Sequence, residues 1–241
     1  MRCVLLCGGS GSRLRPLTNT INKNALPLGM KFLFEYPLEK IREAGIKEVC
    51  IVSSPHHMGS FIENLGSGEK LGLDITYRIQ EKPDGIAHGI YQAKNFARND
   101  DLLVVLGDNI FDFSLKDIVD YHSHRMSTNA FVVVKEVEDP NRFGVVEYNS
   151  EGKVQQIIEK PKEAPSKDAV IGIYCYPTDV FDKIEKLQPS ARGEYEVTDL
   201  NNLYIQEGKL RTHKVDGFWC DAGTPESLKI AQDWAWKQQG H

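Results

Sequence analysis

The amino-acid sequence predicts an α/β protein, built on a mostly parallel mixed sheet that is flanked by helices. Short apolar runs bounded by Gly, Asp or Pro recur along the chain, which is typical of strands covered on both faces. Amphipathic helical patterns alternate with these runs over about the first 110 residues, as in βαβ units with parallel strands. From Ala130 to Tyr176 the strand-like runs follow one another with little helix between them. A small β-rich portion with antiparallel or mixed pairing is therefore expected there.

The individual elements follow from the same two periodicities. The predicted strands are Arg2–Cys7, Val49–Ser53, Ile75–Ile79, Leu102–Leu106, Ala130–Val134, Phe143–Tyr148 and Val170–Tyr176. An amphipathic helix is predicted from Phe34 to Ala44, with Leu38 and Ile41 facing inward and Gly45 ending it. The other predicted helices are Pro55–Leu65, Ile86–Ala97, Leu115–Arg125, Thr178–Leu187, Thr198–Gly208 and Pro225–Gln238.

Composition and charge exclude several classes of protein. The chain has 241 residues, of which 41% are hydrophobic and 26% are charged, as in an ordinary globular protein. Lys and Arg number 29 against 34 Asp and Glu, which gives a net charge of −5. An acidic balance argues against nucleic acid and anionic membranes as partners. It leaves room for a small anionic ligand, which needs only a local cluster of basic groups.

Cysteine usage and the distribution of apolar residues bear on location. The five cysteines form no C-x-x-C pair, so a disulfide framework is not expected and a reducing cytoplasm is the expected compartment. The first apolar stretch, Cys3–Cys7, is too short for the core of a signal peptide. No run approaches the ~20 apolar residues of a membrane span.

The first predicted strand leads into a glycine-rich loop with an arginine. Glycines let backbone N–H groups approach phosphate oxygens closely, and the Arg13 guanidinium can hold such oxygens with two parallel hydrogen bonds. Lys23, farther along the chain, is a candidate second phosphate ligand. The loop lacks the Gly-Lys-Ser/Thr of a Walker A motif and the third glycine of a dinucleotide fingerprint. By itself it is equally compatible with a tight turn that carries a surface arginine.

Additional segments extend this pattern over nearly the whole chain. They are Tyr36–Leu38, Gln80–Ala87, Leu106–Phe111, Arg142–Glu147, Glu159–Pro161, Ala169–Tyr174, Ala191–Asp199 and Trp219–Thr224. In this order and spacing, they resemble the sugar-1-phosphate nucleotidylyltransferases, in particular the thymidylyltransferases that act on glucose-1-phosphate. The resemblance implies a Rossmann-like nucleotidyltransferase fold in a single domain over 1–241. Residues 1–128 would form a nucleotide-binding half and 129–241 a sugar-phosphate-binding half.

The resemblance also implies a reaction and its partners. The sugar phosphate of glucose-1-phosphate would attack the α-phosphorus of dTTP with the help of Mg²⁺, giving dTDP-glucose and pyrophosphate for deoxysugar or polysaccharide biosynthesis. A homo-oligomer is expected by analogy. Three alternatives remain open: the same chemistry with UTP, the same chemistry with another sugar-1-phosphate, and a catalytically weak paralogue that binds nucleotide sugars for regulation. A Rossmann dehydrogenase is disfavoured by the missing glycine.

The residues that match the family's catalytic and metal-binding positions are charged. Arg13 would clamp the β- and γ-phosphates and Lys23 would meet the α-phosphate region, with Lys160 as the other catalytic cation. Asp108 and Asp221 match the metal-binding aspartates, and carboxylate oxygens suit Mg²⁺. Asp108 follows a predicted strand, at the edge where open α/β sheets bind ligands. Without the family context, each aspartate is more commonly a turn residue or a helix cap.

Two further sets of residues match binding positions of the family. The nucleotide-binding set is Gly8, Gly9, Gly11, Ser12, Gln80 and Gly85. The amide of Gln80 carries a donor and an acceptor, so it suits thymine or uracil and, flipped, cytosine. The sugar-phosphate-binding set is Gly144, Glu159, Lys160, Val170 and Arg192. Taken alone, Glu159 and Lys160 would be the solvated end of a strand and Arg192 a surface charge.

The sequence also departs from the family pattern. Cys7 stands in place of an alanine, His88 in place of a glutamine and Phe143 in place of a tyrosine. Met30 and Phe32 bring apolar bulk where polar and turn-forming residues are common, for packing in the core or at an oligomer contact. The chain is shorter than the long thymidylyltransferases, so their additional C-terminal nucleotide site is not expected.

Overall fold

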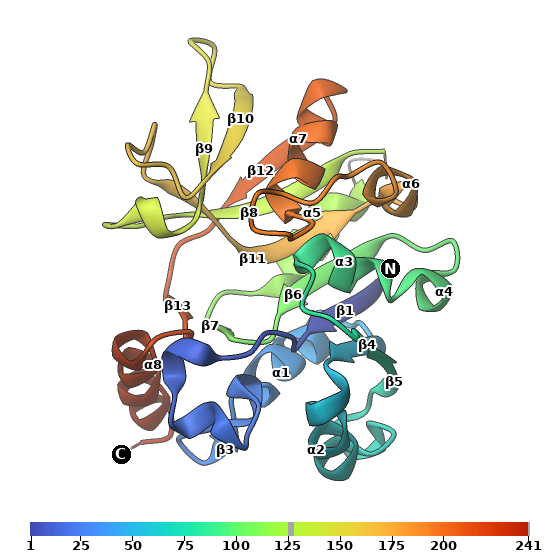
Figure 1. The fold of residues 1–241 in the computed structure, drawn as a ribbon, viewed down its shortest axis with the longest axis vertical. Coiled ribbons are helices and arrows are strands. Elements are labelled where there is room, and N and C mark those ends of the chain that lie inside the picture. Colours follow the sequence, from blue (N-terminus) through green and yellow to red (C-terminus); the bar gives the residue numbers. More distant parts are fainter. Residues whose placement is uncertain (125–127, 241) are drawn as a thin grey trace. The chain divides into compact units, whose positions relative to one another are not determined.

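The computed structural model describes residues 1–124 and 128–240 and divides into two compact units (Figure 1). The first, called here the glycine-loop unit, contains Arg2–Pro83, Val105–Lys116 and Gly217–His241. The second, called the β-rich unit, contains Met1, Asp84–Val104 and Asp117–Asp216. Strand β6 (Leu102–Leu106) and helix α5 (Leu115–His124) contribute residues to both units.

Three parallel strands form the sheet of the glycine-loop unit. They are β1 (Arg2–Leu6), β4 (Glu48–Ser53) and β5 (Asp74–Ile79), with β4 paired to both of the others. All five residues of β1 are buried. Helices α1 (Glu35–Glu43) and α2 (Pro55–Leu65) provide the βαβ crossovers. Because the strands are parallel, the loops that leave their carboxyl ends meet at one edge of the sheet.

A smaller layer of this unit joins segments that are distant in the sequence. Strand β7 (Asn109–Phe111) pairs with β13 (Trp219–Asp221), and β2 (Pro27–Leu28) pairs with β3 (Lys31–Phe32), both antiparallel. Helix α8 (Pro225–Gln238) begins with a capping box at Thr224 and Ser227. Its Ala231 and Ala235 pack in a cluster with Leu28 and Ile110. This packing anchors β13, and therefore the segment around Asp221, to the unit.

The β-rich unit contains a mixed sheet with its own helices. The strands are β8 (Ala130–Glu136), β9 (Gly144–Tyr148), β10 (Val154–Glu159), β11 (Asp168–Tyr176) and β12 (Leu210–Lys214). Antiparallel pairing gives the order β10-β9-β11-β8, and β12 adds to β8 in parallel. The helices are α3 (Ile86–Tyr91), α4 (Lys94–Ala97), α6 (Val180–Ile184) and α7 (Val197–Gln206). Tyr174, Tyr176 and Tyr204 stack in the core between β11 and α7.

The structure confirms the predicted fold class and every predicted strand. Parallel pairing occupies the βαβ region and antiparallel pairing the region after residue 130, as expected. The predicted helix Ile86–Ala97 is instead two helices, because Ala93 donates to the carbonyl of Ile90, three residues back, and breaks the α-helical ladder. Short strands β2, β3, β7, β12 and β13 were not predicted, since strands of two to five residues carry almost no periodicity.

Two further expectations concern the end of one predicted helix and membrane-spanning segments. Arg125, the predicted end of the helix that starts at Leu115, lies outside the described residues. Within 1–124 and 128–240, no helix has the length and apolar character needed to cross a membrane.

Candidate functional site

A pocket of about 660 Å³ opens at the carboxyl edge of β1, β4 and β5 in the glycine-loop unit. The glycine loop forms one wall of it. Gly9 and Gly11 have φ angles of 94° and 58°, in the left-handed region that favours glycine. A Cβ on Gly11 would also lie 2.9 Å from Cγ2 of Thr18, whose hydroxyl donates to the Gly11 carbonyl. The loop therefore needs glycine both for its backbone conformation and for close packing.

Gln80 lies directly beside the first glycine of that loop. It follows β5, is 8% exposed, and its backbone N–H donates to the carbonyl of Ser53 at 2.9 Å. A Cβ on Gly8 would lie 3.1 Å from the side-chain oxygen of Gln80. The amide predicted to contact the base therefore borders the loop predicted to bind phosphate, within the same unit and the same pocket.

Asp108 is held at the end of β6 by contacts to two other segments. The N–H of Gly107 donates to the carbonyl of Leu6, and the carbonyl of Asp108 accepts from the N–H of Ala222, both at 2.9 Å. The side-chain Oδ1 accepts from Nδ2 of Asn109 at 3.0 Å, and Oδ2 pairs with the ammonium of Lys23. Sequence reasoning predicted both charged residues but not their direct pairing.

The Lys23–Asp108 pair is charged in both members. Burial alone would raise the pKa of the Asp108 carboxyl, but the Lys23 ammonium and the Asn109 amide hold it below its ordinary value. Burial likewise opposes the charge on Lys23, yet Asp108 and, more weakly, Asp221 raise its pKa. A charged ammonium therefore lies where two carboxylates act on it.

Asp221 and Arg13 complete the cluster. Pairing of β7 with β13 places Asp221 opposite Asn109, next to Asp108 in the chain. A Cβ on Gly223 would lie 2.9 Å from Oδ1 of Asp221 and 3.1 Å from Nη2 of Arg13, so these two side chains crowd the same backbone position. We call Arg13, Lys23, Asp108 and Asp221 the charged cluster.

Two carboxylates at one place fit the divalent cation that the resemblance implies. Mg²⁺ is bound in proteins by one or two carboxylates together with water and substrate phosphates. Asp108 and Asp221 offer such oxygens, and no larger group of His, Cys, Asp or Glu suited to a metal occurs in the described part of the chain. Cys7, beside this cluster, stays protonated, because burial and the charge of Asp108 raise the pKa of its thiol. All five cysteines are buried, and each keeps its thiol rather than forming a disulfide bond.

In the β-rich unit, residues of the sugar-phosphate set form one row across three strands. Strand register pairs Glu159 of β10 with Gly144 of β9, and Gly144 with Val170 of β11. A Cβ on Gly144 would lie 3.5 Å from Oε2 of Glu159, so the glycine keeps this place open. Lys160 follows with a φ of 44°, an unusual conformation for a residue with a side chain, and its ammonium is 3.3 Å from Glu159.

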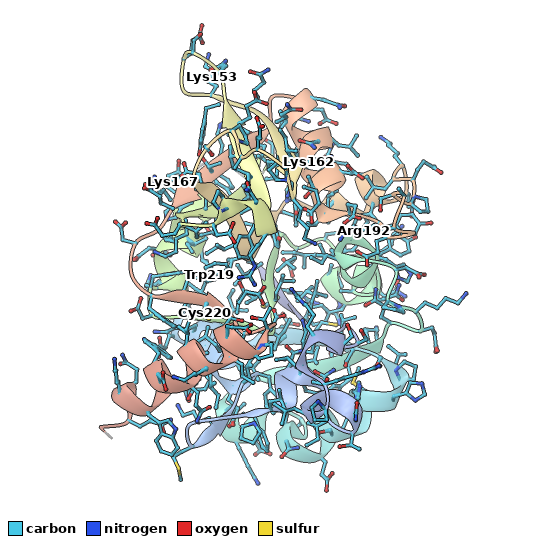
Figure 2. The ribbon with its side chains drawn as sticks, turned by 60° about the vertical axis from the view of Figure 1, so that its left-hand side comes forward. Lys153, Lys162, Lys167, Arg192, Trp219 and Cys220 are labelled. Carbon is cyan, nitrogen blue, oxygen red and sulfur yellow. The ribbon has the colours of Figure 1, made fainter. Side chains whose placement is uncertain are left out.

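Arg192 reaches the same row from the loop before α7, where Figure 2 labels it. Its Nη2 lies 2.9 Å from both carboxylate oxygens of Glu196 and 3.5 Å from Oε1 of Glu159. The hydroxyl of Thr198 donates to the other oxygen of Glu159 at 2.7 Å. Glu196 and Thr198 position two predicted residues and were not themselves predicted. Their segment matched the family pattern, but the sequence gives no sign of which carboxylate the arginine meets.

Gly85 has a structural reason of its own to be glycine. It precedes α3 with a φ of 102°, and a Cβ there would lie 2.5 Å from the carbonyl oxygen of Tyr195. Tyr195 also donates to Asp84 and accepts from Ala87 through its backbone. The close approach of these two segments explains the glycine, while its predicted contact with the base stays a prediction. Gly85 belongs to the β-rich unit, whereas the rest of the nucleotide set, including Ser12, belongs to the glycine-loop unit.

The departures from the family pattern occupy different surroundings. Met30 is 74% exposed, which excludes core packing, one of its two expected roles, while Phe32 stacks on Phe34 with 5.4 Å between ring centres. His88 lies 3.0 Å from the side-chain nitrogen of Gln92 and 4.0 Å from Asp84, in the β-rich unit. Phe143 packs against the guanidinium of Arg142.

Comparison with protein families and known proteins supports the family assignment. The model of the nucleotidyl transferase family matches residues 2–235. A low-salt glycan biosynthesis nucleotidyltransferase of Haloferax volcanii is 41% identical over 230 residues, which are 95% of this chain and 64% of that protein. A glucose-1-phosphate thymidylyltransferase of Neisseria meningitidis is 38% identical over 233 residues, or 96% of this chain and 81% of the relative. The chain thus spans less than two thirds of the Haloferax protein.

Two solved structures share the fold over the whole chain. A putative glucose-1-phosphate thymidylyltransferase from Bacillus anthracis is 41% identical, with a TM-score of 0.93 over 98% of this chain and 95% of that one. A UDP-glucose pyrophosphorylase complexed with UDP-glucose is 26% identical, with a TM-score of 0.85 over 98% of both chains. Together with the family model, these matches show that the chain belongs to the sugar-1-phosphate nucleotidyltransferases of the nucleotidyl transferase family.

Proposed function

We propose that the protein transfers a nucleotidyl group from dTTP to glucose-1-phosphate, giving dTDP-glucose and pyrophosphate. The observation that carries the proposal is the charged cluster beside the glycine loop, within one compact unit. The proposal is supported by relatives named glucose-1-phosphate thymidylyltransferase, including one of Mycobacterium tuberculosis that is 37% identical over 240 residues.

The chemistry needs positioning and charge stabilisation rather than a covalent nucleophile. An oxygen of the sugar phosphate attacks the α-phosphorus, a new P–O bond forms, and the bond to the bridging oxygen breaks to release pyrophosphate. Arg13 would hold the β- and γ-phosphates and stabilise the leaving group. Lys23, kept protonated by Asp108, would stabilise the charge that develops on the α-phosphate oxygens.

Asp108 and Asp221 would hold Mg²⁺, which supplies charge neutralisation and orientation of phosphate oxygens when bound. The donor atoms fit, because both side chains present carboxylate oxygens at the paired ends of β7 and β13. Lys23, held against Asp108, would donate another of its ammonium protons to a phosphate oxygen. The chain's own contribution is to hold these oxygens and cations in place before substrate arrives.

Residues of the β-rich unit would bind the sugar phosphate. Lys160 and Arg192 supply positive charge, and their contacts with Glu159 keep both side chains near one end of the strand row. Glu159 would accept hydrogen bonds from sugar hydroxyls, and Gly144 and Val170 would offer backbone groups. The row would let these three residues, distant in sequence, contact one ligand.

A second candidate keeps the chemistry and changes the substrate. UTP, or another sugar-1-phosphate, is favoured by the likeness to a UDP-glucose pyrophosphorylase and by the glycan nucleotidyltransferase among the relatives. A regulatory paralogue with weak catalysis is ranked below both, because Arg13, Lys23, Asp108 and Asp221 are all present and gathered in one unit.

A pyrophosphate-release assay tests these alternatives. It crosses dTTP, UTP, CTP, ATP and GTP with a panel of sugar-1-phosphates, in Mg²⁺ and in excess chelator. We expect the highest kcat/KM with dTTP and glucose-1-phosphate, and no turnover in chelator. A preference for UTP would select the second candidate. Nucleotide-sugar binding without turnover for any pair would select the regulatory paralogue, and turnover without metal would exclude the proposed mechanism.

A further inference from the structure

The corner between β4 and α2 lines the same pocket as the glycine loop and Gln80. Ser54, His56 and His57 all border it, at the place where β4 ends between its partners β1 and β5. None of these residues belongs to the motifs that carry the family resemblance. The corner is also tied to both neighbours, since Ser53 accepts the backbone N–H of Gln80 and donates its hydroxyl to the carbonyl of Cys7.

Ser54 occupies a capping position without acting as a cap. It is the residue before α2, where a serine side chain ordinarily accepts a hydrogen bond from the helix backbone. Here its side chain makes no such capping bond, and Pro55 at the first helical position has no N–H to offer. The hydroxyl of Ser54 therefore does not cap the helix, and the residue borders the pocket.

The two histidines add ring nitrogens that can form hydrogen bonds to this wall. Partial burial and the neighbouring His56 lower the pKa of His57, so its imidazole is neutral near pH 7 and presents one donor and one acceptor. Pro55 and Pro83 contribute apolar surface to the same pocket. A hydroxyl, the His57 imidazole and apolar surface together suit a base and a pentose.

The charged residues around the pocket also favour a nucleoside over a phosphate. Arg15 and Glu81 both line it, and their charges oppose one another. The charged cluster, by contrast, gathers Arg13 and Lys23 around the two aspartates. The phosphates therefore have a separate set of cations in the same unit, which leaves the corner for the nucleoside.

We propose that Ser54, His56 and His57 form a second recognition element for the nucleoside of the triphosphate, which acts with Gln80 in selecting the base and the pentose. This inference rests on the proposed function, because it names what the pocket beside the glycine loop binds. It assigns three residues to substrate selection that no motif of the sequence singles out.

The test uses Ser54→Ala, His56→Ala and His57→Ala with dTTP, dUTP and UTP, each saturating in sugar-1-phosphate. The pair dTTP and dUTP differs only in the 5-methyl group, and the pair dUTP and UTP only in the 2′-hydroxyl. We expect His57→Ala to raise the nucleotide KM about threefold to tenfold, the size of one lost neutral hydrogen bond. The ratio of KM values for dTTP and dUTP, or the ratio for dUTP and UTP, should change. The KM for the sugar-1-phosphate should stay constant.

Matched variants separate recognition from folding. Glu63→Gln lies on the same helix outside the pocket and should leave all KM values unchanged. His57→Gln keeps a donor and an acceptor, so it should restore part of the affinity, and it replaces His57→Ala if that variant does not fold. Gln80→Ala is the positive control for altered base selection.

Three outcomes would overturn the inference. They are unchanged nucleotide KM values in all three corner variants, a uniform rise for dTTP, dUTP and UTP that leaves both ratios constant, and an equal rise in the sugar-1-phosphate KM. Calorimetric binding of the same nucleotides provides a readout that does not need turnover. If the wild-type protein binds nucleotide but transfers it to no sugar phosphate, the proposed function fails while the corner remains testable.

Discussion

The two units hold their charged residues in opposite ways. In the glycine-loop unit, the side chains of Lys23 and Asp108 are 18% and 10% exposed, and each is the other's ion-pair partner. In the β-rich unit, the side chains of Lys160 and Arg192 are 50% and 46% exposed and share carboxylates at a solvated rim. Buried pairs are fixed and weakly screened, whereas exposed pairs exchange partners at little cost.

This difference predicts that the two units affect different kinetic constants. Groups that act on the transferring phosphate must be in place before the reaction, because reorganising them would add to the barrier. Groups that capture a sugar phosphate from solution need to release their resting partners, and Arg192 can leave Glu196 more readily than Lys23 can leave Asp108. Variants of the first unit should therefore change kcat and stability, and variants of the second should change the sugar-phosphate KM.

The largest effect is expected from Asp108→Asn. The proposed reaction would lose a metal ligand, so kcat should fall by about 10²- to 10³-fold, the range seen when one electrostatic contact to a transition state is removed. The melting temperature should fall as well, because the buried Lys23 keeps its charge without its main partner. Pyrophosphate release and thermal unfolding measure the two effects separately.

A double variant distinguishes the catalytic loss from the structural one. Lys23→Met combined with Asp108→Leu removes both charges, which should recover stability but no activity. Asp221→Asn also removes a proposed metal ligand, so the activity of this variant should fall. Its melting temperature should fall less, because Lys23 keeps its main partner, Asp108. If the three proteins lost activity only in proportion to their stability, Asp108 would be a structural residue.

Gly223→Ala should have the next largest effect. The new Cβ would lie 2.9 Å from Oδ1 of Asp221 and 3.1 Å from Nη2 of Arg13, so both side chains must move. Displacement of reacting groups by about 1 Å can cost 10²-fold, and we expect a fall in kcat of up to that size.

Gly144→Ala is the matched glycine of the other unit. Its new Cβ would meet Ile157 at 3.3 Å and Glu159 at 3.5 Å, which a small side-chain shift can relieve. We expect a modest rise in the sugar-phosphate KM and little change in kcat. Equal kinetic consequences in the two glycine variants would contradict the proposed division between the units.

Arg192→Lys should act on binding of the sugar phosphate. The guanidinium bonds Glu196 with two nitrogens and reaches Glu159, which a single ammonium cannot reproduce. The KM for glucose-1-phosphate should rise about tenfold, the size of a lost charge-assisted hydrogen bond, with an unchanged KM for dTTP. Initial-rate kinetics with each substrate varied in turn measure this, and a matching rise for dTTP would speak against the assignment.

The smallest effect concerns stability of the β-rich unit at low pH. Burial, and next the charge of the N-terminal amino group, lower the pKa of His122, which is 1% exposed and 3.9 Å from Asp101. His122 therefore binds a proton more readily in the unfolded chain. Its contribution to the free energy of unfolding is fully present above the ordinary pKa of about 6.5 and is lost as the pH drops below it. In His122→Phe, chemical unfolding between pH 7 and 5 should show a shallower decline than in the wild type. Identical slopes would remove His122 as the cause.

Sequence reasoning reached much of the candidate site because the resemblance named residues one by one. Arg13, Lys23, Asp108 and Asp221 lie together in the glycine-loop unit, while their roles in binding and catalysis stay predictions. It missed Asn109 and Glu196, which hold Asp108 and Arg192, because a hydrogen-bond partner is set by strand pairing and loop geometry. It gave Gly85 a binding role and could not detect the packing against Tyr195 that requires a glycine there.

The sequence by itself determined the alternation of strands and helices, the glycine loop after β1 and the chemical types available for phosphate and sugar. These are local properties, written in periodicity and in the backbone freedom of glycine. Only the tertiary structure decided that β7 pairs with β13, which brings Asp221 to Asp108 across more than a hundred residues. It likewise placed Glu159, Gly144 and Val170 in one row and Ser54 to His57 on the wall of the pocket beside the glycine loop. The pairing of distant strands depends on which apolar faces are buried against one another. The sequence of one segment does not specify which other segment will cover it.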